Sequence, residues 1–98
     1  MKTNFKDIIT GNTPILVDFF ATWCGPCKTL IPILADVKKE LCDQVKIIKI
    51  NLDNNQTLAT QLQVRGVPTL LLFKDGKQVW RKSGVLQKDE LTHIIKTS

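Results

Sequence analysis

The chain has 98 residues, of which 43% are hydrophobic and 23% charged, and its formal net charge is +5 at pH 7. This length predicts one domain, residues 1–98, with two or three layers and no room for a separate substrate domain. The Lys and Arg residues are spread along the chain and Tyr is absent, so the basic stripe with interleaved aromatic residues that is typical of nucleic-acid binding is missing. No apolar run approaches the roughly 20 residues of a membrane span.

The amino terminus, MKTNFKDIIT, carries charged and polar residues where a secretory signal needs about 7–15 apolar ones. It therefore predicts a segment of the mature fold and a cytoplasmic protein. Phe5, Ile8 and Ile9 recur at helical spacing and predict a short first helix. Thr3 or Asn4 would be the N-cap of that helix.

Residues 15–21, ILVDFFA, form an apolar run that only Asp18 interrupts, which predicts a central strand covered on both faces. Apolar residues then return at helical spacing and predict an amphipathic helix over residues 28–41, with Cys27 in its first turn. Pro32 lies inside this segment and should kink the helix, because proline removes a backbone hydrogen bond.

The sequence VKIIKINLD predicts the next strand over residues 45–53. A short helix follows, for which either Asn54 or Asn55 would be the N-cap. We expect this helix to end near Gly66, because glycine is a common helix terminator.

Another apolar strand is predicted over residues 69–73, and Asp75-Gly76 predicts a hairpin turn into a strand over residues 78–83. A last helix should begin near Lys88, although Gln87 is a poor N-cap. It would bury three apolar residues, Leu91, Ile94 and Ile95. The resulting order, α-β-α-β-α-β-β-α, predicts an α/β fold in which a parallel crossover precedes an antiparallel hairpin.

Two cysteines stand three positions apart in ATWCGPCK, residues 21–28, a spacing that redox centres share with zinc sites. Cys42 and His93 are the remaining candidate metal ligands. A continuous helix would place Cys42 roughly 22 Å from Cys27, too far for a shared metal or a disulfide. We expect Cys42 to be a partly buried residue at a helix end, with a regulatory thiol as the alternative, and His93 to be an exposed polar residue.

The position of the pair favours redox chemistry over zinc binding. Free N–H groups and the positive end of the helix dipole stabilise a thiolate at a helix N-terminus, where Cys24 gains most. Gly25-Pro26 allows a tight turn from strand to helix, and Pro26 suits the first helical position. Cys27 lies one step further into the helix, so it should be shielded from solvent and react second.

WCGPCK, with VDFFA before it and RGVPTLLLF and KDGK after it, resembles the thioredoxin family from about Ile15 to the end of the chain. The resemblance implies a thioredoxin-like three-layer α/β/α sandwich around a central mixed sheet of four or five strands. Only 14 residues precede the first clear strand, so the extra N-terminal strand of the family is expected to be missing or vestigial. Phe20 stands where many relatives carry a second tryptophan.

The resemblance also implies a general protein disulfide reductase. Cys24 would attack the substrate, Cys27 would resolve the mixed disulfide, Asp18 would be the buried acid behind them and Lys49 the companion of Asp18. An apolar groove would receive the substrate, and its residues would be Trp23, Gly66, Val67, Pro68, Gly84 and Val85.

The same resemblance implies no bound cofactor other than the redox-active disulfide itself. Electrons would come from NADPH through a thioredoxin reductase, because the chain has no glycine-rich nucleotide-binding motif of its own. Partners would be that reductase and disulfide-containing proteins, with neither nucleic acid nor a membrane involved, and the protein would be a monomer.

Several of these residues also have simpler structural interpretations. Asp18 inside an apolar strand is costly unless it is paired or protonated. Burial would raise the pKa of its carboxyl, which could then exchange a proton with Cys27 through water. Alternatively, the Asp18 side chain reaches solvent at a strand end. Lys49 would neutralise Asp18 or face outward. Pro68 would form a cis bond that turns the backbone of Val67 toward substrate, or it would begin a strand in the trans form. Trp23, next to a cysteine expected to face solvent, is either an exposed contact residue or a core aromatic.

Three functional alternatives remain open at this point. A disulfide oxidase or isomerase would use the same motif, but Gly-Pro between the cysteines is associated in the family with reducing members. A redox-independent interaction module would retain activity after both cysteines are replaced. A zinc protein would contain stoichiometric metal.

Overall fold

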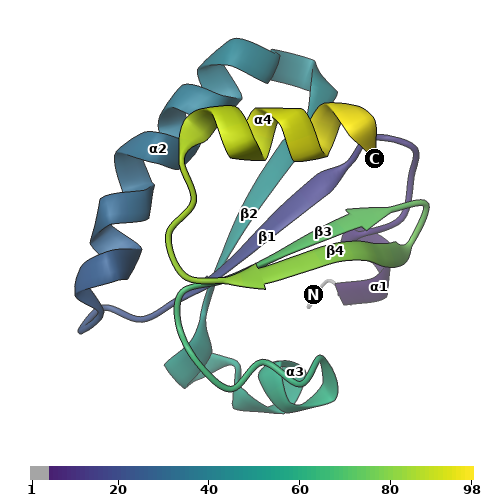
Figure 1. Ribbon diagram of the computed structural model, residues 1–98. Coiled ribbons are helices and arrows are strands. Elements are labelled where there is room, and N and C mark those ends of the chain that lie inside the picture. Colours follow the sequence, from purple (N-terminus) through teal and green to yellow (C-terminus); the bar gives the residue numbers. More distant parts are fainter. Residues whose placement is uncertain (1–4) are drawn as a thin grey trace.

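Four strands form one mixed sheet with helices on both faces in the computed structural model, which describes residues 5–98 (Figure 1). The helices are α1 (Phe5–Ile8), α2 (Gly25–Leu41), α3 (Gln56–Gln61) and α4 (Lys88–Thr97), with 3₁₀ turns η1 (Cys42–Gln44) and η2 (Leu52–Asn54). The strands are β1 (Ile15–Phe20), β2 (Lys46–Asn51), β3 (Thr69–Lys74) and β4 (Lys77–Ser83). The predicted caps Thr3 and Asn4 lie outside the described residues.

The strand order is β2-β1-β3-β4, with β1 parallel to β2 and antiparallel to β3. The predicted crossover and hairpin are therefore confirmed, and among residues 5–98 the sheet has four strands. β1 is one of the two inner strands, which explains why its sequence is apolar on both faces. In its register Asp18 lies opposite Lys49 of β2 and Leu70 of β3, an alignment that places the buried acid next to a lysine.

Alternate residues of β1 enter two separate cores, because successive side chains of a strand point to opposite faces. Leu16 packs with α2 and α4, and Phe19 packs on the face that α1 and α3 cover (Figure 1). Helix α2 contributes its predicted apolar residues to the first core, namely Leu30, Leu34, Val37 and Leu41. The three-layer α/β/α sandwich is thus confirmed. Within residues 5–98 no helix is both long enough and apolar enough to cross a membrane.

Helix α2 begins at Gly25, three residues before the predicted start. The cause is Cys24, whose extended backbone and sulfur make it the N-cap, so that both following residues can join the helix. Pro26 is consequently the second helical residue and not the first. The helix continues past Pro32, and the kink expected there stays a prediction.

The predicted boundaries around β2 and α3 are wrong at three points: β2 begins at Lys46, one residue late, β2 ends early, and α3 ends early. β2 ends at Asn51, two residues early, because the Asn51 side chain accepts the Asp53 N–H at 2.9 Å and starts the turn η2. Asn55 is the N-cap residue of α3, which confirms one of the two predicted positions, although its side chain donates to the Asn51 carbonyl at 2.9 Å and does not cap the helix. α3 ends at Gln61, well before Gly66.

The hairpin turn is confirmed at Asp75 and Gly76, which have φ angles of 53° and 78°. Positive φ at both central residues matches the twist of paired strands and explains why Asp-Gly is favoured there. β4 begins at Lys77, one residue before the predicted start. α4 begins at Lys88 as predicted, but Ile94 is only half-buried.

Candidate redox site

Cys24 and Cys27 form a disulfide across the first turn of α2, with their Cα atoms 5.3 Å apart. The Cys27 N–H donates to the Cys24 sulfur at 3.1 Å, so the first helical turn directs a backbone donor at Cys24. This is the contact that would stabilise a thiolate on Cys24. Each cysteine is 4% exposed, so the shielding expected of Cys27 is confirmed, whereas the solvent-facing position expected of Cys24 is wrong for the disulfide form.

Asp18 is buried behind the disulfide, with 2% of its surface exposed. Its Oδ1 has no hydrogen-bond partner in the described part of the chain. Burial raises the pKa of this carboxyl to about 6, and the positive charge of Lys49 opposes that rise. Asp18 is therefore poised to gain and lose a proton near neutral pH, which a surface aspartate is not.

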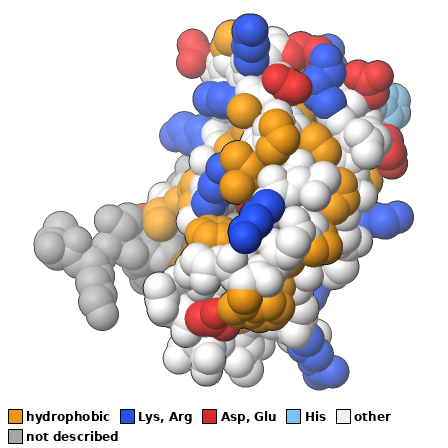
Figure 2. Space-filling model, turned by 90° about the vertical axis from the view of Figure 1, so that its left-hand side faces the viewer, with side chains coloured by type: hydrophobic (Ala, Val, Ile, Leu, Met, Phe, Trp, Pro, Cys, Tyr) orange, Lys and Arg blue, Asp and Glu red, His pale blue; other side chains and the backbone are white. Residues whose placement is uncertain are grey.

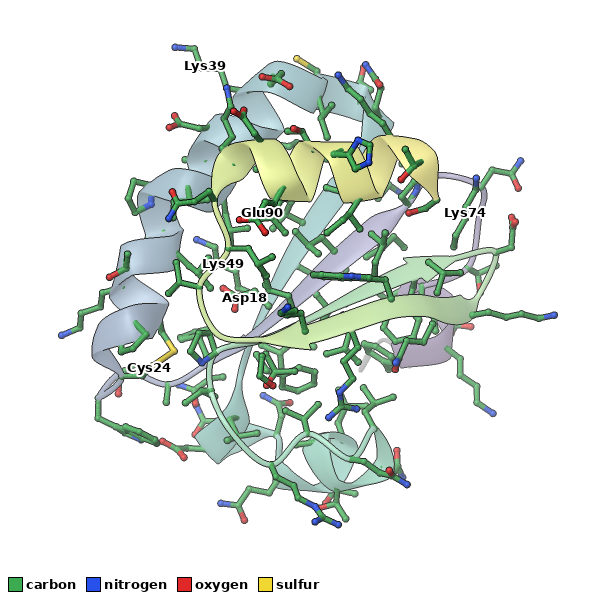
Figure 3. The ribbon with its side chains drawn as sticks, in the orientation of Figure 1. Asp18, Cys24, Lys39, Lys49, Lys74 and Glu90 are labelled. Atoms are coloured by element: carbon green, nitrogen blue, oxygen red, sulfur yellow. A yellow bond between two sulfur atoms is a disulfide. The ribbon has the colours of Figure 1, made fainter. Side chains whose placement is uncertain are left out.

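One cavity of about 420 Å³ connects these groups, since Asp18, Cys27 and Lys49 all line it. Figure 3 shows Asp18 and Lys49 side by side near the disulfide end of α2. Lys49 is exposed, and its positive charge nevertheless lowers the pKa of Asp18, so elements of both predicted alternatives hold. The structure thus brings together the buried acid, its companion lysine and the second cysteine.

The apolar surface predicted around the disulfide is also assembled. Trp23 is 68% exposed and Val85 37%, whereas Val67 is half-buried and packs against the cluster that Ala21 forms with the two cysteines. The Val67-Pro68 peptide bond is cis, as expected from the resemblance. Figure 2 views the side of the molecule at which α2 lies and shows hydrophobic side chains gathered there among Lys and Arg side chains.

The loops that carry this surface are tied to the sheet by hydrogen bonds. Gly84, whose φ is 98°, donates its N–H to the Pro68 carbonyl at 2.9 Å. The Thr69 hydroxyl donates to the Gly66 carbonyl at 2.7 Å. These contacts hold the segments 66–68 and 84–85, which are distant in the sequence, next to each other.

Asp53 is a site residue that the sequence analysis missed. The indole N–H of Trp23 donates to Asp53 Oδ2 at 2.9 Å, across a separation of 30 residues. Asp53 lies in the turn η2, and its own N–H is held by Asn51. Only the tertiary fold brings η2 next to the disulfide, so no local pattern could have indicated this contact.

We expect Asp53→Ala to release the Trp23 ring and to slow reduction of a protein disulfide about two- to fivefold through KM, because one charge-assisted but exposed hydrogen bond is lost. The ring can be followed by fluorescence anisotropy in a Trp80→Phe background, where Trp23 is the only fluorophore. Asp53→Asn keeps an acceptor and is the matched control. Unchanged anisotropy in Asp53→Ala would contradict a positioning role.

The third cysteine and the histidine lie away from this site. Cys42 is exposed, so its predicted partial burial is wrong. It is the C-cap residue that follows α2, and its thiol donates a hydrogen bond to the Lys39 carbonyl at 3.3 Å. His93 is exposed on α4, as expected. No group of three or more His, Cys, Asp or Glu residues in the described part of the chain is arranged to hold a metal ion.

A pair of thiols that closes to a disulfide across one helical turn can open another disulfide and close again, so the fold and the site define the class of thiol–disulfide oxidoreductases. Comparison with known proteins agrees with this class. The family model described as Thioredoxin matches residues 1–97. The chain therefore belongs to the thioredoxin family, and it acts as a protein-disulfide oxidoreductase through Cys24 and Cys27.

Individual relatives support the same assignment. The thioredoxin of Rickettsia prowazekii is 43% identical over 98% of this chain and 92% of its own length. The thioredoxin of Acidithiobacillus ferridurans is 46% identical over 91% of this chain and 82% of its own. Among solved structures, a mutant thioredoxin from Halobacterium salinarum superposes with a TM-score of 0.88 at 39% identity, covering 99% of this chain and 84% of that one.

Proposed function

We propose that the protein, acting as a single domain, is a general disulfide reductase of the cytoplasm that receives electrons from NADPH through a thioredoxin reductase. The observation that carries the direction of attack is the backbone N–H of Cys27 directed at the Cys24 sulfur. Stabilising negative charge on Cys24 favours the reduced, nucleophilic form of the pair, which is the form a reductase must present to its substrate.

In the first step the Cys24 thiolate attacks one sulfur of the substrate disulfide. A Cys24–substrate disulfide forms, the substrate S–S bond breaks, and the other substrate sulfur leaves as a thiolate that takes a proton from solvent. Gly25 and Pro26 place no large side chain over the attacking sulfur. Cys27 and Asp18 line the same cavity.

In the second step Cys27 loses its proton and attacks Cys24, which releases the second substrate thiol and restores the disulfide. Asp18 is the group that would accept the Cys27 proton, because both line the same cavity and the raised pKa of Asp18 makes it a base of suitable strength. Lys49 would stabilise Asp18 in its charged form before the transfer. Two electrons pass from the dithiol to the substrate.

The substrate would lie as an extended segment on the apolar surface described above. Trp23 and Val85 supply exposed apolar area, and Val67 lies against the disulfide. Gly66, Pro68 and Gly84 belong to the two loops that form the surface and would allow a peptide backbone to approach closely. We propose that a monomer is sufficient, because every group used in the two steps lies in one chain.

We expect the protein to reduce insulin disulfides with NADPH and a bacterial thioredoxin reductase, with NADPH consumed in proportion to insulin reduced. A parallel reaction with dithiothreitol in place of the reductase tests the dithiol alone. Activity should be lost in Cys24→Ser and retained in the matched control Cys42→Ser, whose sulfur is exposed elsewhere. Activity with dithiothreitol but with no reductase would contradict the proposed electron source, and no activity with either would contradict the proposed function.

A further inference from the structure

The cavity next to Cys27 has apolar walls that no proposed step uses. Phe20 and Ala21 line it from β1 and the loop that follows, and Ile31 lines it from α2. Ile31 is 52% exposed, although it lies one helical turn after Cys27. A large aliphatic side chain left in solvent beside an apolar hollow is typical of a surface that binds another apolar group.

The cavity also contains a carboxyl oxygen that is unpartnered within residues 5–98 and two exposed lysines. Asp18 is 2% exposed, yet its Oδ1 finds no partner among the described residues. Lys28 and Lys49 both line the cavity and are both exposed, so they place positive charge on its solvent side. Asp18 is the only acid among the described residues that line it. A ligand that fits would be apolar where it enters and negatively charged where it meets solvent.

We propose that this cavity is a specificity subsite for protein substrates, which takes an aliphatic or aromatic side chain next to the reactive cysteine together with an adjacent Asp or Glu. The inference rests on the proposed function, because it assigns the class of segment that the reductase prefers. Its volume of about 420 Å³ is sufficient for one large side chain. Charge complementarity with Lys28 and Lys49 selects an acidic neighbour over a basic one.

Occupation of the subsite would also position the substrate for the exchange. An apolar side chain seated in the cavity holds the neighbouring cysteine of the substrate beside the reactive pair. The preferred segments should therefore be bound more tightly and, below saturation, reduced faster.

The test uses the full chain in its reduced form, in single turnovers that need no reductase. Four peptides serve as substrates, and the single cysteine of each forms a disulfide with the same Gly-Cys-Gly peptide. The peptides differ only in the two residues next to that cysteine, which are Leu-Glu, Ala-Glu, Leu-Gln or Leu-Lys. Each rate is divided by the rate with 2-hydroxyethyl disulfide, which has neither feature. We expect this ratio to be about tenfold higher for Leu-Glu than for Ala-Glu, and about two- to fivefold higher than for Leu-Lys.

Matched variants separate the subsite from general effects. Ile31→Ala should lower the preference for Leu over Ala, whereas Val79→Ala, at a residue that is 50% exposed on β4, should leave it unchanged. Lys28→Glu should reverse the preference for Glu over Lys, whereas Lys39→Glu, further along α2 (Figure 3), should not. All four positions are exposed, so the fold should tolerate the changes.

Two results would overturn the proposal: equal ratios for all four peptides in the unmodified chain, or preferences that Ile31→Ala and Lys28→Glu leave intact. Failure of the unmodified chain to reduce both the peptides and 2-hydroxyethyl disulfide would instead contradict the proposed function on which the inference rests. The two failures are therefore distinguishable, because the small disulfide reports on the dithiol without the subsite.

Discussion

Cys27→Ser will abolish catalytic turnover and accumulate covalent complexes with substrate proteins. Once Cys24 has opened a substrate disulfide, the mixed disulfide persists unless a second thiol attacks Cys24. Cys27 is the thiol one helical turn away, with the two Cα atoms 5.3 Å apart, and a serine hydroxyl cannot take its place. The complexes should be visible on non-reducing gels after incubation with a protein disulfide substrate and should disappear with dithiothreitol.

The complementary variants assign the two sulfurs. Cys24→Ser should trap little or no substrate, because Cys27 does not receive the helix N-terminal hydrogen bond that Cys24 accepts. Cys42→Ser should leave turnover within about twofold of the unmodified chain, since surface substitutions away from a site have small effects. Trapping by Cys24→Ser instead of Cys27→Ser would reverse the assigned roles, and trapping by neither would favour an interaction module that does not use the dithiol.

The fold was largely predictable because its elements have strong local signals. The apolar run of β1, the helical spacing in α2 and Asp75-Gly76 each give a period or a turn that depends on few residues. Boundaries were less predictable where side chains compete with the backbone. Asn51 ends β2 by capping the next turn, and Cys24 starts α2 early by acting as its N-cap. Neither boundary can be predicted from apolar periodicity.

The cysteine pair and the buried acid could be located from sequence, but their surroundings could not. A charged residue inside an apolar strand is visible in the sequence, whereas the register that sets Asp18 opposite Lys49 depends on how two strands align. The Trp23–Asp53 hydrogen bond joins segments whose proximity exists only in the folded chain. The exposure of Ile31 was missed for a related reason, because helical spacing identifies the buried face of α2 and does not show which exposed apolar residue borders a cavity.

Asp18→Asn will stabilise the protein at neutral pH and slow its catalysis. The native carboxyl has its pKa raised from 3.8 to about 6, so between these pH values the native state binds more protons than the unfolded chain. The free energy of unfolding therefore falls as pH rises through this window. The full shift corresponds to about 3 kcal/mol, all of it lost above the native pKa. An asparagine has no ionised form to bury, so the variant should not show this loss.

Urea unfolding of the disulfide form at several pH values measures this effect directly. The stability difference between Asp18→Asn and the unmodified chain should approach about 3 kcal/mol above pH 7 and vanish below about pH 4. Asp43→Asn, which removes an exposed carboxyl, is the matched control and should change the free energy of unfolding by no more than about 0.5 kcal/mol. Insulin reduction by Asp18→Asn should be about 10- to 100-fold slower at pH 7, because the acceptor of the Cys27 proton is gone. A variant that gained stability but kept its turnover from pH 6 to 9 would show that Asp18 is only a buried charge. The stability gain reports the burial of the carboxylate, whereas the slower turnover reports the loss of the proton acceptor.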